Sequence, residues 1–173
     1  MPLRVYSNRS SVLAYLLTFL HGIILSWLSF SLPVYFQVLL EASPLMSGVY
    51  LLAIVIPLAP SGMMGGVAVA ITGRYKPILV IGFILLAIIV GCLAILTGES
   101  SPALWIIFQI IVGTRAGLTL TATMPAGQTT VAEAEVAVAT TSWAFARSFG
   151  AIWGALQYRL LSSILDLIAN CLR

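Results

Sequence analysis

The chain has 173 residues, of which 61% are hydrophobic and only 8% are charged. Soluble domains carry roughly 25% charged residues, so this composition excludes an ordinary soluble core. The net charge of +3 comes from eight basic residues spread along the chain. Binding to nucleic acid would need clustered Lys and Arg, and is not indicated.

Residues 1–11 form a short polar lead before the first apolar segment, with Arg4 and Arg9 as its charges. A basic start before an apolar run also occurs in signal peptides. Here the run continues to about Leu40, well beyond the roughly 7–15 apolar residues of a signal peptide. We therefore interpret the run as a first membrane span and the lead as cytoplasmic.

Long apolar segments fill most of the remaining chain. About 20 apolar residues are needed to cross the ~30 Å hydrocarbon core of a bilayer, whereas buried strands run only about 4–8 residues. The sequence therefore predicts an all-α polytopic membrane bundle over residues 12–157, with the lipid bilayer as its surroundings. Its five spans are expected at residues 12–38, 46–71, 78–97, 103–126 and 136–157.

The odd number of spans would place the two ends of the chain on opposite sides of the membrane. Short loops rich in Lys and Arg face the cytoplasm. Basic residues precede span one and follow span two, at Arg74 and Lys76, and are absent after spans one and three. This pattern predicts a cytoplasmic N-terminus. The fourth gap should then be cytoplasmic too, but it carries Glu133 and Glu135 and no basic residue.

Residues 158–173 differ from the spans because they are too short to cross a membrane and contain Arg159, Asp166 and Arg173. As a helix, this tail would gather its Leu and Ile residues on one broad face, which is typical of a helix lying at the membrane surface. A disordered end is the alternative, and the sequence leaves both open.

Glycines recur at four-residue spacing, which lets helix backbones approach closely in lipid. Helix packing is the expected role of these residues, which are Gly62 with Gly66, Gly113 with Gly117, and Gly150 with Gly154.

Polar side chains concentrate in spans one, four and five, and are nearly absent from spans two and three. Polar groups in a span are costly unless they face a cavity or a partner, so the three spans are candidates for lining a polar path. For a single Ser or Thr, a hydrogen bond to its own helix carbonyl is the simpler explanation. Arg115 and Arg147 lie deep in spans four and five, and each needs a counter-charge or a wet cavity. The nearest acids to Arg147 in sequence are Glu133 and Glu135.

His21 is the single histidine and a candidate proton relay, because its ordinary pKa lies near neutrality. One histidine cannot form a histidine-based metal cluster, and Cys92 and Cys171 form no metal or redox spacing. No nucleophile elbow, zinc-protease motif or phosphate-binding glycine loop is present. We expect no enzyme activity, no metal and no cofactor.

The loop after span two contains Gly66, Gly73, Arg74 and Lys76 in the sequence Gly-Val-Ala-Val-Ala-Ile-Thr-Gly-Arg-Tyr-Lys. This segment resembles the cytoplasmic loop motif of the major facilitator superfamily. It departs from that motif at Ala70 and Ile71, where the family carries an Asp-Arg pair. Residues 18–22, 32–37, 42–49, 72–77, 136–140 and 145–150 resemble fungal multidrug facilitators of the fourteen-span drug:proton antiporter type.

The resemblance covers about residues 8–155 and implies the first five helices of a facilitator's C-terminal half. It implies proton-coupled efflux of small, often amphiphilic or toxic molecules, with plasma membrane as the family default. The expected substrate or proton path is His21, Gln37, Gln109 and Arg147.

Such a path would be completed by a missing N-terminal bundle or a second chain, because facilitators work with two bundles. The alternative is a non-transporting membrane fragment or an interaction protein that assembles through its glycine faces. Arg115 stands where relatives have a small residue. It should either disrupt a close helix contact or face a polar cavity.

Overall fold

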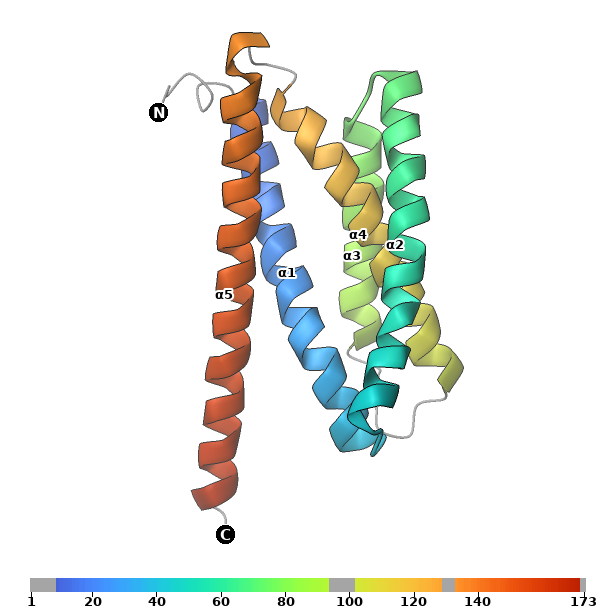
Figure 1. Cartoon of the computed structure of the whole chain (residues 1–173), viewed down its shortest axis with the longest axis vertical. Coiled ribbons are helices and arrows are strands. Elements are labelled where there is room, and N and C mark those ends of the chain that lie inside the picture. The colour runs from blue at the N-terminus through green and yellow to red at the C-terminus, as the bar shows by residue number, and fades with distance from the viewer. Residues whose placement is uncertain (1–8, 94–101, 129–132, 172–173) are drawn as a thin grey trace.

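The computed structural model describes residues 9–93, 102–128 and 133–171 (Figure 1). Helices α1 (Arg9–Leu39), α2 (Pro44–Thr72), α3 (Lys76–Leu93), α4 (Pro102–Gln128) and α5 (Val136–Cys171) make up nearly all of these residues, with a 3₁₀ turn, η2 (Glu133–Glu135), before α5. The predicted all-α bundle of five helices is confirmed. The loop at Gly98–Pro102 and most of the lead lie largely outside the described residues.

Successive helices run in opposite directions, so that α1 begins and α5 ends at opposite ends of the bundle (Figure 1). Within the described residues, three helices are long and apolar enough to cross a membrane, over Ser11–Val38, Pro44–Thr72 and Ala103–Gln128. The described part of α3 is a shorter apolar helix over Lys76–Ile89. Polar residues dilute the apolar character of α5. The spans at α3 and α5 therefore stay predictions.

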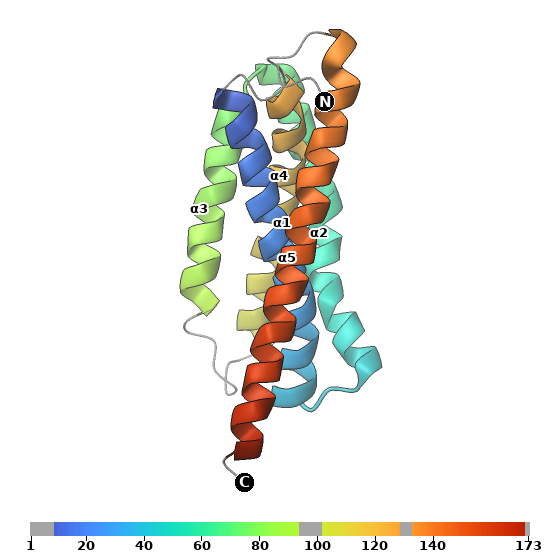
Figure 2. The same cartoon turned by 90° about the vertical axis from the view of Figure 1, so that its left-hand side faces the viewer.

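The helices associate in two main pairs. Helix α1 packs along α5, and α2 packs along α4, while α3 covers another side of α4. Contacts between α1 and α2, and between α4 and α5, are slight. Figure 2 shows α5 crossing α1 and shows α3 on the outer side of the bundle.

Glycines form the contact between α2 and α4. A Cβ added to Gly113 would collide with the carbonyl of Ile54, and one added to Gly117 would collide with the hydroxyl of Ser61 and the carbonyl of Leu58. Gly62 faces Gly117 from α2 at ordinary contact distance. The two backbones approach so closely that larger side chains do not fit.

The contact between α1 and α5 is built in the same way. Added Cβ atoms at Gly150 and Gly154 would collide with the carbonyls of Phe19 and Ile23 on α1. From the other side, Gly22 faces the carbonyl of Arg147. The sequence spacing did not single out Gly22, which has no glycine partner four residues away.

Gly66 is placed differently from the other spaced glycines, with open space around it. Gly65 takes the interior position on α2, where an added Cβ would come within 2.6 Å of the Thr121 hydroxyl oxygen. Gly73 ends α2 in the left-handed conformation, with φ 61°, and its N–H donates to the Val69 carbonyl at 2.9 Å. Arg74 in the short turn and Lys76 at the start of α3 follow, and both are exposed.

An aromatic cluster joins α1, α2 and α4 at the end of the bundle near residue 41. The ring of Trp105 lies 5.1 Å from Phe36 and 4.9 Å from Tyr50, centroid to centroid. Such tilted pairs add roughly 0.5–1.5 kcal/mol each beyond area burial. The pairing of helices is therefore fixed at this end by rings and in the middle by glycines.

The tail is not a separate segment in the structure, because α5 continues without a break through residue 171. Its 36 residues give a length of about 54 Å at 1.5 Å per residue, and its C-terminal part projects beyond the other helices (Figure 1). A disordered tail before residue 171 is inconsistent with this helix. Whether the projecting part contacts a membrane surface stays a prediction.

We predict opposite effects for two Gly→Ala substitutions. Gly117→Ala should lower the free energy of unfolding by about 1–3 kcal/mol, because the added methyl group overpacks the α2/α4 contact. Gly66→Ala, the matched control, should be neutral or stabilising by up to about 1 kcal/mol, because it adds helix propensity in open space. Titration with a denaturing detergent, followed by circular dichroism, measures both. Equal effects would contradict the assigned packing.

Candidate functional site

Two of the predicted path residues are buried and two are exposed. His21 on α1 is 4% exposed and Gln109 on α4 is fully buried. Gln37 and Arg147 are exposed. Gln37 lies sixteen residues after His21, about 24 Å along α1, so the structure does not bring these two residues together.

The structure instead brings His21 close to both deep arginines. His21 lies within electrostatic range of Arg115 on α4 and Arg147 on α5. The three residues are eleven to thirteen positions from the N-terminal ends of their helices, roughly 16–20 Å along each axis. His21 and Arg115 are buried at this level of the bundle, and Arg147 lies at the same level on the exposed side of α5.

Arg115 is 1% exposed, and its Nε and Nη1 atoms have no hydrogen-bond partner. Other buried atoms without a partner are His21 Nδ1, Thr119 Oγ1 and both amide atoms of Gln109. A buried polar group left unpaired costs about 1–3 kcal/mol, and a charged one costs more. These atoms show where, within the described bundle, buried polar side chains lack hydrogen-bond partners.

Most other hydroxyls in the described helices bond to carbonyls of their own helix, as the simpler explanation predicts. Thr18 donates to Ala14 O at 2.8 Å, and Thr114 donates to Ile110 O at 2.8 Å. Thr119 differs, because its oxygen has no partner and would lie 2.6 Å from a Cβ added to Gly82 on α3. Gly82 makes room for this hydroxyl, a relation that no sequence spacing reveals.

Arg115 does not disturb the glycine contact between α2 and α4. It lies two residues from Gly113 and from Gly117, which turns it about 200° around the helix from each. The glycines face α2, and Arg115 points to another side of α4. Of the two alternatives expected for Arg115, disruption of this contact is not supported, because helical phase turns its side chain away from the glycines.

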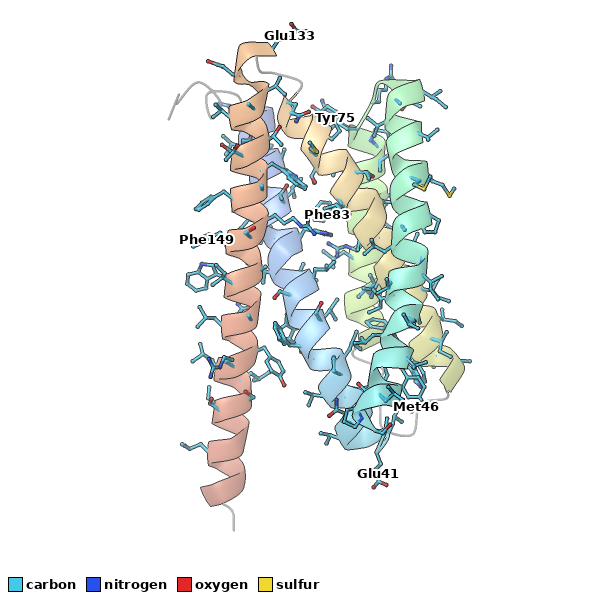
Figure 3. All side chains as sticks on the ribbon, in the orientation of Figure 1. Glu41, Met46, Tyr75, Phe83, Glu133 and Phe149 are labelled. Atoms are coloured by element: carbon cyan, nitrogen blue, oxygen red, sulfur yellow. The ribbon has the colours of Figure 1, made fainter. Side chains whose placement is uncertain are left out.

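The acidic side chains that the structure describes lie at the ends of the bundle. Figure 3 shows Glu41 at one end and Glu133 at the other. Glu135 precedes Arg147 by twelve residues, about 18 Å along the helix, which is too far for an ion pair. The Arg147 guanidinium lies instead 5.8 Å from the centre of the Trp143 ring. The two acids proposed as partners of Arg147 do not pair with it.

Two hydrogen bonds connect α4 to α5 near the η2 end. Trp143 Nε1 donates to Thr123 Oγ1 at 3.2 Å, and Gln128 Nε2 donates to Thr140 Oγ1 at 2.8 Å. Trp143 thereby links the α4 helix to Arg147. No pattern in the sequence indicates this role of Trp143.

The length and apolar character of the helices define an integral, multi-pass membrane bundle. Over 154 residues, 89% of its length, the chain is 40% identical to the Efflux pump FUS6 of Gibberella fujikuroi, of which it covers 28%. It is 38% identical over the same share to the MFS-type efflux pump LUC4 of a Fusarium species, covering 27%. It is 36% identical to the Acurin A biosynthesis cluster MFS-type transporter of Aspergillus aculeatus, over 89% of the chain and 28% of that protein.

The chain is thus homologous to part of the MFS-type efflux pumps, and the predicted resemblance to the major facilitator superfamily is confirmed. It spans about a quarter of the length of the curated relatives it matches. Those relatives are named as transporters and efflux pumps, not as enzymes. No family model matches the chain, and no solved structure matches it.

We predict that Arg115→Met makes the isolated bundle more stable. A methionine of similar length removes an unpartnered charge from the interior, which should raise the free energy of unfolding by about 2.5–3.5 kcal/mol. Arg159→Met, at an exposed position of α5, should change it by less than about 0.5 kcal/mol. Intrinsic tryptophan fluorescence during detergent unfolding gives both values. A loss of stability in Arg115→Met would show that Arg115 has a stabilising partner.

Proposed function

We propose that this chain acts as part of a major-facilitator-type secondary transporter that exports small molecules by proton-coupled efflux. The observation that carries the proposal is 36–40% identity to proteins named as efflux pumps and transporters over 89% of the chain. We assign the chain to the C-terminal half of such a protein, on the motifs between residues 8 and 155.

The polar path of this proposal runs between α1, α4 and α5. His21 and Gln109 are its buried members, and Arg147 and Gln37 are its exposed ones. Gln37 lies near the far end of α1, where it would meet a substrate at the mouth of the path. We assign proton transfer to His21, because an imidazole can both accept and donate a proton.

A second bundle is part of the proposal. Alternating access needs two bundles that rock around a site at the bilayer midplane, and the chain spans about a quarter of its relatives' length. An N-terminal bundle, or a second chain, would supply the opposite wall. The glycine contacts hold α1 to α5 and α2 to α4, so each pair would move as one body.

We propose a plasma-membrane protein with the N-terminus of α1 in the cytoplasm. The basic turn at Arg74 and Lys76 supports this orientation through the positive-inside rule. That turn lies at the same end of the bundle as the start of α1 (Figure 1).

A chimera tests the proposed activity. The matched 154-residue segment of the Efflux pump FUS6 of Gibberella fujikuroi is replaced by that of this chain. In a yeast strain lacking its own drug exporters, we expect lower accumulation of an amphiphilic fluorescent dye than in cells with an empty vector. Collapsing the proton gradient should abolish the difference.

The matched control is the same chimera with Gly117→Leu, which should reach the membrane poorly or remain inactive because α2 cannot approach α4. A chimera that reaches the membrane in full amount but exports none of the dyes that the parent exports would contradict the proposal.

Orientation is tested by cysteine labelling. In a chain with Cys92→Ser and Cys171→Ser, we expect Ala42→Cys to react with a membrane-impermeant maleimide on intact cells. Arg74→Cys should react only after the cells are permeabilised, because its exposed loop faces the cytoplasm. The reverse pattern would place the N-terminus outside.

The second candidate is a non-transporting membrane protein that assembles through helix packing. It is favoured by the close glycine contacts that hold α1 to α5 and α2 to α4. Substrate-coupled proton flux by the purified chain alone in proteoliposomes would exclude this candidate. Activity of the chimera without activity of the chain alone would support a transporter part that needs its second bundle.

A further inference from the structure

The buried Arg115 side chain is the part of the bundle that the proposed function does not use. It is 1% exposed, and two of its nitrogen atoms have no partner. Thr119 lies one turn further along α4, on the same face, and its hydroxyl is also buried without a partner. Unpaired donors on neighbouring turns of one helix indicate a place for an acceptor.

His21 adds a third unpaired nitrogen close to this place. Its Nδ1 atom has no partner, and its ring lies within electrostatic range of Arg115. Arg147 adds a second positive charge from the exposed side of α5. Among the described side chains, the acids lie at the ends of the bundle, as Figure 3 shows for Glu41 and Glu133. The positive charge here is therefore not balanced by a described side chain.

An apolar groove lies on the same side of α1. It is lined from α1 by Leu17, one turn before His21, and from α3 by apolar residues that include Leu79 and Phe83, with Lys76 as its one charged residue. Phe83 directly follows Gly82, which faces the Thr119 hydroxyl. The groove has a volume of about 580 Å³, and its walls come from the two helices that flank Arg115 and Thr119. Gly82, which faces Thr119, and Phe83, which lines the groove, are therefore neighbours on α3.

We propose that Arg115 and Thr119, with His21, bind the carboxylate of a small amphiphilic anion whose apolar part lies in the α1/α3 groove. A guanidinium can bind a carboxylate through two parallel hydrogen bonds, and the Thr119 hydroxyl can donate one more. As a statement about the transported substrate, this rests on the proposed function. The binding of the anion can be measured on this chain without any transport activity.

The test measures binding of octanoate to the full chain in nanodiscs of zwitterionic phosphatidylcholine by isothermal titration calorimetry, with empty nanodiscs as the baseline. We expect saturable binding of octanoate, and weaker binding of octanol and octylamine, which share its apolar part but lack the negative charge. Arg115→Gln and Thr119→Val should each weaken octanoate binding, the former by roughly tenfold to a hundredfold.

Arg159→Gln is the matched control, because it removes an exposed arginine from α5 and should leave octanoate affinity unchanged. Thr119→Val keeps the shape of the side chain, so it still tests the site if Arg115→Gln fails to fold. Equal affinities for octanoate and octanol would overturn the proposal. So would unchanged octanoate binding in a folded Arg115→Gln or Thr119→Val variant.

The two proposals can fail separately. Octanoate binding without efflux by the chimera would remove the proposed function and keep the anion site. Efflux of dyes by the chimera without octanoate binding by the chain would remove the anion site alone.

Discussion

The close approach of helix backbones at glycines is the constraint on which the rest of this bundle depends. In lipid, apolar side chains gain little by leaving their surroundings for each other, so packing at short range must hold helices together. Here the glycines of α4 meet carbonyls of α2, and the glycines of α5 meet carbonyls of α1. These contacts determine which helices pair. The sides of α1 and α4 that do not take part in the glycine contacts carry buried polar side chains.

The two pairs are related by a simple exchange. If α1 is exchanged with α4, and α2 with α5, the α1/α5 pair becomes the α4/α2 pair. The same exchange turns the slight contact of α1 with α2 into the slight contact of α4 with α5. Repeats of three helices within each half are a property of facilitators, so the packing and the similarity to efflux pumps agree. In this arrangement His21 and Arg115, on the two exchanged helices, are brought together at the centre.

Much of this could be predicted from the sequence, because apolar length predicts helices and four-residue spacing predicts close contacts. Gly113, Gly117, Gly150 and Gly154 lie where the spacing indicated. The choice of Gly65 over Gly66 was not predictable, because residues three and four positions along a helix lie on nearly the same side and the crossing of α2 over α4 decides between them. Gly82 and Thr119 meet across two helices far apart in sequence, and nothing local indicates such a contact. The continuation of α5 beyond residue 157 was missed because Arg159 and Asp166 make that part too polar for a span, although charge does not end a helix.

Arg115 shows why helical phase matters more than proximity in sequence. Between two glycines it should have destroyed the packing, yet two residues turn it to the side of α4 that faces α1 and α3. There it imposes a cost that apolar packing alone would avoid, since an unpaired buried charge destabilises the bundle. A structure can retain such a residue when the surrounding contacts are strong, and the glycine contacts of α4 with α2 are independent of it. Residues that cost stability and occupy an interior with unpaired donors are the ones that binding can explain. In the proposed site, the positive charge without a described acid is the reason why the ligand is taken to be an anion.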